Sequence, residues 1–378
     1  MLKCIGLLKQ GLLGGTDRII NDFECWLVEN NYKVKFLNDG KEHYFQDVEL
    51  IVLPTSELFW LWKNRRKINK NCKVMIWCMG HDALQAYFFN ESNKNKFYNA
   101  VFSLLYRCFA NSIFDKNALS YTDIVGENLD LNNLQKKLTN QSSNIFPIPI
   151  FIPEIPQSII FNKNKQSNSF YWIGRVDRDF KVWSLIELLD ELSLWVHEHN
   201  VKITFHIIGD GDGLHLIDKK KYSFEIIKLG NLQYREMENR IHQDASLIFA
   251  MGTSALEGAK FSIATVVVNP LRESEIKVTY RWVYDSIGCS LGEFKACFTY
   301  PEQKAESLDS ILNTFINNTT ACSSKSYEYS KIFNRIAVYK KILNDYQMRP
   351  YFNSIRSCLF IPYFSYRLKR TIKAMVGK

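Results

Sequence analysis

Three short segments between residues 170 and 270 combine glycine with side chains suited to a phosphorylated, hydroxyl-bearing ligand. Each segment lies where an apolar run of strand length gives way to Gly or Ser and then to a helical pattern, which is where open α/β sheets place ligand sites. Arg175 offers a planar fork of donors, Lys181 a point charge and Glu257 a two-oxygen acceptor. The segments are Trp172-Ile173-Gly174-Arg175 with Lys181, Phe205 to Gly211, and Gly252 to Gly258.

Apolar runs and helical patterns alternate around these segments, in the βαβ manner that implies a parallel sheet. Helices are expected at residues 182–197 and 235–242, and again beyond residue 300. The sequence thus predicts a doubly wound second domain at residues 170–345. Its strands are expected at 170–173, 202–208, 224–229, 246–250 and 264–268.

The first 155 residues show the same alternation, which predicts a first doubly wound domain. A run of prolines and a polar stretch predict an interdomain linker at residues 156–169. One face of the first expected helix carries Ile19, Ile20, Phe23, Trp26 and Leu27. The strands are expected at 3–8, 33–37, 48–53, 73–79, 107–110 and 144–148.

In their order and spacing, the three segments resemble the C-terminal half of the GT-B glycosyltransferases, specifically the group-1, family 4-like branch. The resemblance implies two Rossmann-like domains in the GT-B arrangement, with a C-terminal helical segment that crosses back to the first domain. It implies that Arg175 and Lys181 grip the diphosphate of a nucleotide-sugar donor and that Glu257 hydrogen-bonds the ribose. Gly209 and the run Gly252-Thr253-Ser254 are then expected beside the donor.

Two positions depart from the family pattern. Many members carry a second Glu eight positions before the ribose Glu, where this chain has Phe249, so one expected contact to the donor sugar is missing. The spacing from Arg175 to Lys181 is one residue longer than expected, so either the loop 176–180 bulges or Lys181 is not the equivalent residue. The alternative role for Arg175, Lys181 and Glu257 is a surface ion pair or helix cap.

The first domain offers two weaker candidates. Gly14-Gly15 follows the first strand, where backbone N–H groups at a helix start can approach a phosphate, although glycine pairs are also common in turns. His81 follows the strand at 73–79, and in related enzymes a His at a comparable place points toward the transferred sugar. A lone His is more often structural. Together with Arg175 and Lys181, His81 makes up the predicted catalytic set.

No metal or cofactor is expected. Asp210 and Asp212 alternate like metal ligands, but the surrounding glycines indicate a turn, and no His or carboxylate cluster completes a site. The nine cysteines are odd in number and include no Cys-x-x-Cys pair, which argues against a disulfide framework and a zinc site and favours a reducing cytosol. No stretch approaches the ~18 apolar residues needed to cross a bilayer.

Positive charge is concentrated in the predicted C-terminal tail, residues 346–378. The net charge is +9, and from Arg349 onward there are seven basic residues and no acidic one. A basic helix with an apolar stripe predicts attachment to an anionic membrane surface, and the alternative is that the stripe packs on the protein itself. Nucleic acid is not expected, because no binding motif accompanies the charge. The stripe comprises Phe364, Leu368, Ile372 and Met375.

The resemblance and the tail together predict a glycosyltransferase that moves a sugar from a nucleotide-diphosphate sugar to a saccharide or lipid-linked acceptor, with retention of configuration. The expected setting is bacterial surface polysaccharide or lipopolysaccharide synthesis, with the enzyme cytoplasmic and peripheral on the inner face of the cytoplasmic membrane. Two alternatives remain open. One is a sugar-nucleotide epimerase of the same fold, which would have no use for a lipid-seeking tail, and the other is a catalytically inactive GT-B subunit that scaffolds a partner.

Overall fold

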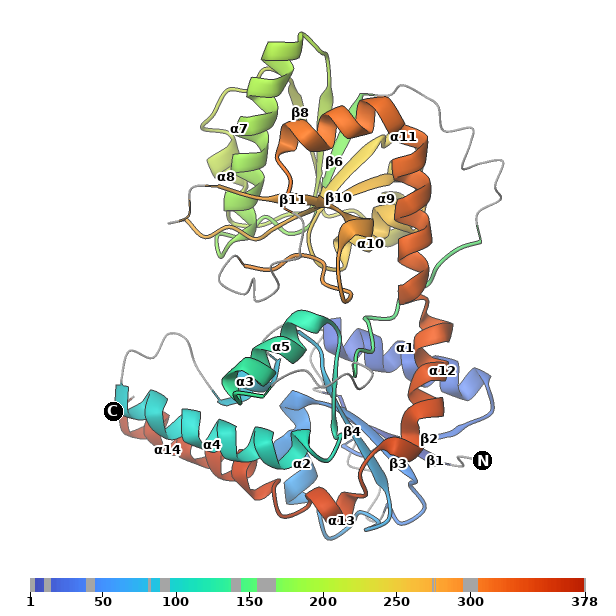
Figure 1. Cartoon of the computed structure of the whole chain (residues 1–378), viewed down its shortest axis with the longest axis vertical. Helices are drawn as coiled ribbons and strands as arrows, with labels where there is room; N and C mark the ends of the chain where they lie inside the picture. The colour runs from blue at the N-terminus through green and yellow to red at the C-terminus, as the bar shows by residue number, and fades with distance from the viewer. Residues whose placement is uncertain are drawn as a thin grey trace. The chain divides into compact units, whose positions relative to one another are not determined.

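The computed structural model of the chain contains two compact units, each built on a largely parallel β-sheet (Figure 1). The first unit comprises residues 1–149 and 335–378, and the second comprises residues 150–334. The structure describes residues 4–9, 15–38, 45–80, 83–88, 96–136, 144–154, 168–273, 275, 277–294 and 305–376.

The sheet of the first unit has the strand order β2-β1-β3-β4-β5, and all its strands are parallel. Strands β3 and β4 are buried along their whole length, as their continuous apolar runs predict for a sheet covered on both faces. The order reverses at β1, because β2 lies on one side of it and β3 on the other. The strands are β1 (Cys4–Leu7), β2 (Lys33–Phe36), β3 (Leu50–Pro54), β4 (Lys73–Cys78) and β5 (Leu119–Tyr121).

Helices cover both faces of this sheet and complete two apolar clusters. In α1, Ile20, Phe23 and Leu27 are fully buried, as the helical spacing of its apolar residues predicts. The helices are α1 (Gly15–Glu29), η1 (Thr55–Glu57), α2 (Leu58–Lys63), α3 (Ala83–Phe88), α4 (Lys96–Phe114), α5 (Ile124–Asn133), α12 (Arg335–Asp345), η5 (Tyr346–Met348), α13 (Phe352–Ile355) and α14 (Phe360–Val376).

Two strand predictions for the first unit are wrong. Residues 107–110 lie inside α4, where Tyr106, Phe109, Ala110 and Ile113 recur at helical spacing and are buried. Residues 144–148 form no strand and pair with the sheet only through a single bridge from Ile145 to Tyr121. The fifth strand is instead β5, whose three residues are too few to show a period.

The sheet of the second unit has the strand order β11-β10-β9-β6-β7-β8. All five strands predicted for this unit are present, and they are parallel to one another. The short edge strand β11 was not predicted, and it runs antiparallel to β10. The strands are β6 (Ser169–Ile173), β7 (Thr204–Ile208), β8 (Glu225–Gly230), β9 (Leu247–Ala250), β10 (Ala264–Val268) and β11 (Tyr280–Trp282).

Apolar clusters cover both faces of the second sheet as well. Helix α7 ends at His199, and the left-handed φ of 52° at the next residue, Asn200, terminates it. Ser307 begins α11 by accepting a hydrogen bond from the Ser310 backbone N–H. The helices are α7 (Lys181–His199), α8 (Leu214–Ile217), α9 (Tyr234–Asp244), α10 (Ser254–Ala259), η2 (Val283–Asp285), α11 (Leu308–Ser330) and η4 (Lys331–Phe333).

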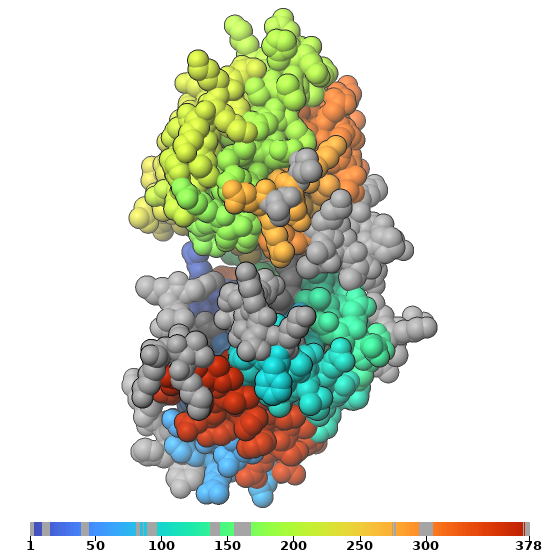
Figure 2. Space-filling model, turned by 90° about the vertical axis from the view of Figure 1, so that its left-hand side faces the viewer, coloured from blue at the N-terminus to red at the C-terminus, as the bar shows by residue number. Residues whose placement is uncertain are grey.

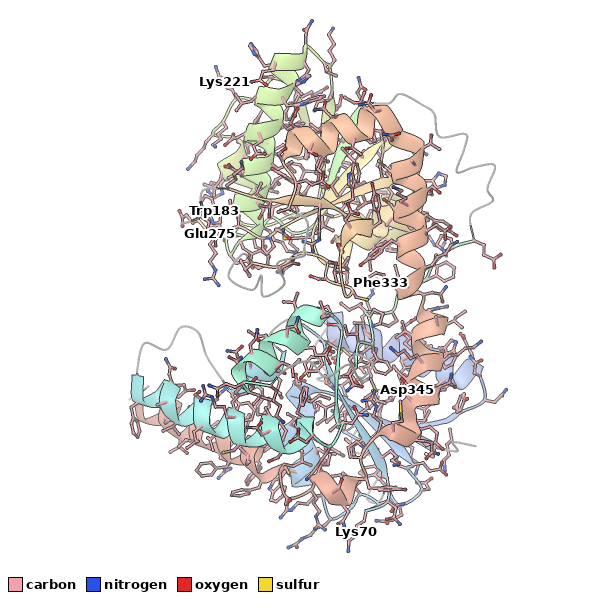
Figure 3. All side chains as sticks on the ribbon, viewed as in Figure 1. Lys70, Trp183, Lys221, Glu275, Phe333 and Asp345 are labelled. Atoms are coloured by element: carbon pink, nitrogen blue, oxygen red, sulfur yellow. The ribbon has the colours of Figure 1, made fainter. Side chains whose placement is uncertain are left out.

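The chain returns from the second unit to the first between Phe333 and Asp345, both labelled in Figure 3. Phe333 is buried in the second unit, whereas Arg335 pairs with Asp22 of α1 at 2.7 Å and Tyr339 donates to the same carboxylate at 2.7 Å. This return confirms the predicted crossing of a C-terminal helical segment to the first domain.

The division of the chain differs from the expected one at α12. The sequence placed residues 335–345 in the second domain, but their apolar side is buried in the first unit, where the Tyr339 ring lies 4.6 Å from the Phe23 ring. The tail that follows belongs to the first unit too. Its Pro350 carbonyl accepts from the Val74 backbone N–H at 3.0 Å, beside the amino end of β4.

Candidate functional site

The order of the second sheet reverses at β6. The chain passes from β6 to β7 and β8 on one side, then returns to β9 and β10 on the other. A crevice for a ligand is expected beyond the carboxyl ends of the two strands that flank such a reversal, here β6 and β9. Gly174-Arg175 follows β6 and Gly252-Thr253-Ser254 follows β9, so two predicted segments meet at this point. The Ser254 Oγ lies 4.0 Å from where a Cβ on Gly174 would stand.

The Gly-rich turn after β7 packs against the loop after β6. Gly209 has a φ of +134°, and a Cβ there would stand 2.0 Å from the Gly174 carbonyl oxygen, so no other residue fits. The Val176 backbone N–H donates to the Asp210 carbonyl at 3.0 Å, and the Val176 carbonyl accepts from Gly213 at 2.9 Å. The glycines therefore have a packing reason of their own. The predicted contact of Gly209 with the nucleotide stays a prediction.

Two cations lie near each other at the end of β6. The Arg175 side chain is 67% exposed and pairs with Asp177 at 2.5 Å. Lys181 is the first residue of α7, and burial together with the charge of Arg175 lowers its pKa. Because these like charges repel each other, an anion bound between them would be stabilised. Neighbouring cations of this kind suit an anionic ligand.

The loop that separates these two cations has its own anchors. The Arg178 backbone N–H donates to Asp212 at 3.0 Å, and the Arg178 guanidinium contacts the His215 Nε2 at 2.7 Å. Trp183, labelled in Figure 3, donates from its indole nitrogen to the Arg178 carbonyl at 3.1 Å. Asp212 thus anchors this loop, and Arg178 is a third cation that the sequence motifs did not indicate.

Glu257 lies in α10 and is oriented by a buried lysine. Lys260 is 2% exposed, and its ammonium lies 2.6 Å from the Glu257 Oε2 and 3.4 Å from the Glu238 Oε1. The helix itself lies close to the sheet, because a Cβ on Gly258 would stand 2.5 Å from the Ile248 Cδ1. The alternative role expected for Glu257 was a surface ion pair or helix cap, and the structure shows an ion pair with a buried lysine instead. The predicted ribose contact stays a hypothesis.

The turn between β9 and α10 depends on a glycine. Gly252 has a φ of +63°, and a Cβ added to it would have no atom within 4 Å, so its backbone conformation, not crowding, favours glycine. Its N–H donates to the Leu291 carbonyl at 2.7 Å, which leaves it no proton for a phosphate. The Thr253 side chain makes no capping hydrogen bond to α10, and Ser254 is the first residue of this helix.

Phe249, at the position of the missing family Glu, lies in the core. It is fully buried in β9 and packs against the rings of Phe170 and Phe205, with centroids 6.2 Å and 6.3 Å away. The side chain at this position therefore lies among apolar residues of the core.

The first unit has its own reversal between β1 and β3, and three polar residues lie at its carboxyl edge. Asp17 in α1 and Glu57 in η1 repel each other, and Asn38 Nδ2 donates to Glu57 at 3.4 Å. Burial, reinforced by the Asp17 charge, raises the pKa of Glu57 to about 7. The sequence motifs did not indicate this pair, although each residue follows a predicted strand. Gly15 opens α1, while Gly14 and His81 lie outside the described residues.

Within the described ranges, no group of three or more His, Cys, Asp and Glu side chains is placed to hold a metal ion. No helix among the described residues is both long enough and apolar enough to span a membrane.

No protein-family model matches the chain, and no curated protein does. Among solved structures, HepE from Anabaena, solved in complex with UDP and glucose, is similar with a TM-score of 0.50 at 12% identity, over 91% of this chain and 99% of HepE. The lipopolysaccharide outer core galactosyltransferase WaaB, in its apo form, is similar with a TM-score of 0.47 at 13% identity, over 91% of this chain and 99% of WaaB. A TarM variant from S. aureus gives 0.46 at 15% identity, over 80% of this chain and 56% of TarM.

The chain has the fold of the GT-B glycosyltransferases, which confirms the predicted fold class. This assignment rests on HepE together with the two doubly wound sheets. At 12% identity the similarity establishes the fold alone. The narrower placement in the group-1 branch stays a prediction.

Proposed function

We propose that the protein is a glycosyltransferase that transfers a sugar from a nucleotide-diphosphate sugar to an acceptor hydroxyl. The observation that carries this proposal is the meeting of Arg175 and Lys181, after β6, with the Gly252–Ser254 turn after β9, at the reversal point of the second sheet. Two cations at such a point suit a diphosphate, and a carboxylate one turn into α10 suits a ribose diol.

The chemistry follows from where charge develops. When the bond from the anomeric carbon to the diphosphate breaks, the leaving oxygen gains negative charge and the sugar becomes oxocarbenium-like. Arg175 and Lys181 would stabilise the leaving diphosphate, because fixed cations placed before the reaction need no reorganisation during it. Glu257 would hold the ribose, with its Oε2 kept in place by Lys260 at 2.6 Å. His81 completes the proposed catalytic set.

Retention of the anomeric configuration and independence from metal are further parts of the proposal. The family resemblance is the ground for retention, and Phe249 removes one donor-sugar contact that retaining relatives use. NMR analysis of the first product formed gives the anomeric outcome directly. The proposed setting is the assembly of a bacterial surface polysaccharide or lipopolysaccharide, with a saccharide or lipid-linked acceptor.

We also propose that α14 holds the enzyme on an anionic membrane surface at the cytoplasmic face. Helix α14 packs along α4 and α2, and Figure 2 shows α14 and α4 next to each other on one face. The expected apolar stripe is divided: Phe364 is 44% exposed, whereas Leu368 and Ile372 are half-buried. The Lys369 ammonium contacts the Tyr87 carbonyl, and burial lowers the pKa of Lys369.

The part of the helix pair that faces solvent remains apolar and basic. Phe360 is 49% exposed and Leu104 of α4 is 64% exposed, and Arg367 and Arg370 of α14 are exposed as well. Neither helix contains an acidic residue. Aromatic side chains with arginines and no carboxylates are the composition that binds anionic lipid.

A donor-binding experiment tests the proposed activity. The purified full-length chain is mixed with UDP-, GDP- and dTDP-sugars, and its thermal unfolding is followed. UDP-glucose comes first, because HepE was solved with UDP and glucose. A ligand present at 100 times its Kd stabilises the folded state by about 2.7 kcal/mol. We expect stabilisation by one sugar nucleotide and release of its nucleotide when a saccharide acceptor is added.

The other outcomes identify the alternatives. Conversion of the free sugar nucleotide into its epimer would identify an epimerase. Binding without transfer to any acceptor would identify a silent scaffold subunit, and failure of every nucleotide to bind would overturn the donor site.

A further inference from the structure

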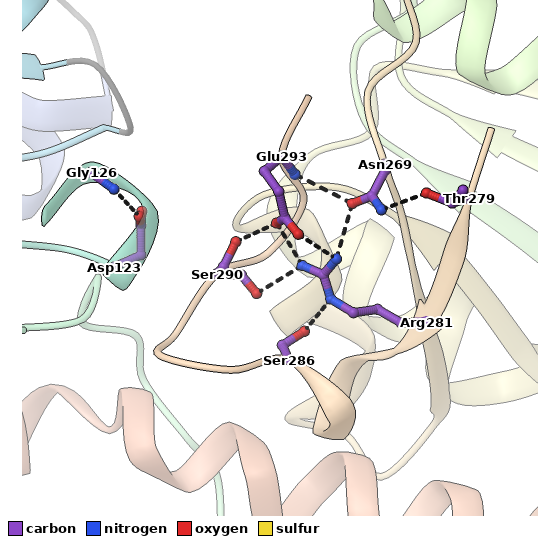
Figure 4. A network of polar contacts seen from close by, with 8 residues as sticks. All are labelled: Asp123, Gly126, Asn269, Thr279, Arg281, Ser286, Ser290 and Glu293. Atoms are coloured by element: carbon purple, nitrogen blue, oxygen red, sulfur yellow. Dashed lines mark hydrogen bonds and ion pairs between the residues drawn. The ribbon is translucent and has the colours of Figure 1, made fainter. Parts of the chain in front are cut away.

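A buried ion pair lies beside the end of β10, outside every motif that the sequence presents (Figure 4). Arg281 of β11 is fully buried, and Glu293 is 1% exposed. The two terminal guanidinium nitrogens each donate to one carboxylate oxygen, both at 2.8 Å. This paired geometry fixes the direction of both side chains as well as their distance.

The remaining donors of Arg281 bind the segment that leads to Glu293. Its Nε donates to the Ser286 Oγ at 3.0 Å, and its Nη2 donates to the Ser290 carbonyl at 3.3 Å. Its Nη1 also donates to the Asn269 Oδ1 at 3.1 Å, and that oxygen accepts from the Glu293 backbone N–H as well. One guanidinium therefore holds both ends of the segment 286–293 against the end of β10.

This segment lies on the turn that follows β9. The Leu291 carbonyl accepts the Gly252 N–H at 2.7 Å, and a Cβ on Gly292 would stand 3.6 Å from the Met251 Cβ. The Leu291 side chain packs in the same apolar cluster as Ala255 of α10. Arg281 thus binds the Ser290 carbonyl, and the carbonyl of the next residue, Leu291, accepts from Gly252, which is part of the proposed donor site.

Stability alone does not account for such a pair. Removing two charges from water costs several kcal/mol for each ion, and replacing a buried pair with apolar residues is often neutral or stabilising. A pair that also makes several directional hydrogen bonds can instead specify the position of a loop. The bonds of Arg281 to Ser286 and Ser290 have that character.

We propose that Arg281 and Glu293 are positioning residues of the donor site, which hold the segment 286–293 so that its Leu291 carbonyl fixes the Gly252 turn. The inference rests on the proposed function, because Gly252 matters here as the start of the turn that carries Ser254 and Glu257. Arg281 and Glu293 are buried and would act on the donor through this turn without contacting it.

The test separates position from stability by comparing three kinds of change. Glu293→Gln leaves Arg281 buried without its counter-ion and should lower the Tm. The double variant Arg281→Met/Glu293→Leu removes both charges and should restore the Tm to near that of the wild type. Ser286→Ala removes one hydrogen bond and keeps the ion pair. Lys220→Ala, which breaks an exposed pair with Asp190, is the control for loss of an ion pair elsewhere in the same unit.

Two readouts are taken for each variant: the Kd for the sugar nucleotide that stabilises the wild type, and hydrogen exchange of peptides that contain the Gly252 amide. In the double variant we expect both the Kd and the exchange rate to rise by about tenfold or more, as for the loss of a hydrogen-bonded contact. Ser286→Ala should raise both by less, and Lys220→Ala should change neither.

A double variant with wild-type Tm, Kd and Gly252 exchange would overturn the inference. If the double variant does not fold, Ser286→Ala decides instead, and unchanged Gly252 exchange in that variant overturns it. If no sugar nucleotide binds the wild type, the donor proposal fails separately, and the Gly252 amide still reports whether Arg281 and Glu293 hold the turn.

Discussion

Lys260 is 2% exposed and holds the Glu257 Oε2 at 2.6 Å, so a buried cation sets the direction of the carboxylate proposed to bind the ribose. The same ammonium lies 3.4 Å from the Glu238 Oε1 and 4.7 Å from the centre of the Tyr234 ring. A carboxylate held in this way loses little further freedom when a ligand binds, which favours affinity.

Glu257→Gln is expected to weaken donor binding by about 1.5 to 3 kcal/mol, the range for a hydrogen bond to a charged group. The fold should persist, because Lys260 keeps Glu238 as a partner. The matched control is Glu238→Gln, which removes the other carboxylate from the same lysine. Titration calorimetry of both variants measures the difference, and an equal loss in the control would assign Glu257 to the ion pair alone.

Arg175→Ala is expected to abolish detectable transfer at subsaturating donor while leaving the Tm close to that of the wild type. The side chain is 67% exposed and its ion pair with Asp177 is a surface pair, so it contributes little to stability. Arg178→Ala is the control, since Arg178 is a cation of the same loop that contacts His215 instead. Transfer by Arg175→Ala within about twofold of the wild type, measured as nucleotide release, would defeat the assignment.

Transfer is expected to survive EDTA. Two cationic side chains lie where the diphosphate is proposed to bind, and they can neutralise it without a metal ion. The measurement is the rate of nucleotide release with and without chelator. A loss of rate that magnesium or manganese restores would reveal a metal ion in the donor complex.

The pKa of Glu57, raised to about 7 chiefly by burial, makes the stability of the protein depend on pH. The folded protein keeps this proton between pH 4.5 and about 7, where the unfolded chain has lost it, so stability falls as the pH rises through this window. Glu57→Gln should therefore be more stable than the wild type at pH 8, by about 1 to 2 kcal/mol after allowance for partial exposure, and nearly equal to it at pH 5.

Urea unfolding at the two pH values checks this prediction. Glu29→Gln, which changes an exposed carboxylate at the end of α1, is the control and should have the same effect at both. An effect of Glu57→Gln that does not change between pH 5 and pH 8 would show that Glu57 is ionised in both.

Arg367→Glu/Arg370→Glu is expected to release the protein from anionic vesicles without changing donor binding. Each basic residue near such a surface contributes about 1 kcal/mol of attraction, and salt should weaken binding because charges are screened within about 10 Å at ~0.1 M. Lys219→Glu/Lys221→Glu makes the same change in net charge at exposed positions of the second unit. Cosedimentation with vesicles measures the binding of both variants. An equal loss of binding in both would show that net charge alone causes the effect.

Sequence periodicity by itself determined the two doubly wound units. The strands from β6 to β10 were predictable because each is a short apolar run between helical patterns, which is a local signal. The motif positions at the ends of β6 and β9 were predictable for the same reason, since a ligand site follows a strand in this fold class. Strand β5 was not predicted, because three residues are too few to show a period. The strand predicted at residues 107–110 is part of a helix, because a short apolar run fits either element.

Only the tertiary structure decided which of these residues have partners. Glu257 forms an ion pair with Lys260. Arg281 forms an ion pair with Glu293, which lies at the other end of a loop. Asp17 and Glu57 repel each other because β1 and β3 are neighbours in the sheet. In the sequence, 42 residues separate Leu7 from Leu50. Periodicity reports the face of each element that is buried, whereas pairing of charges depends on which elements become neighbours, and that is set by packing across the whole sheet.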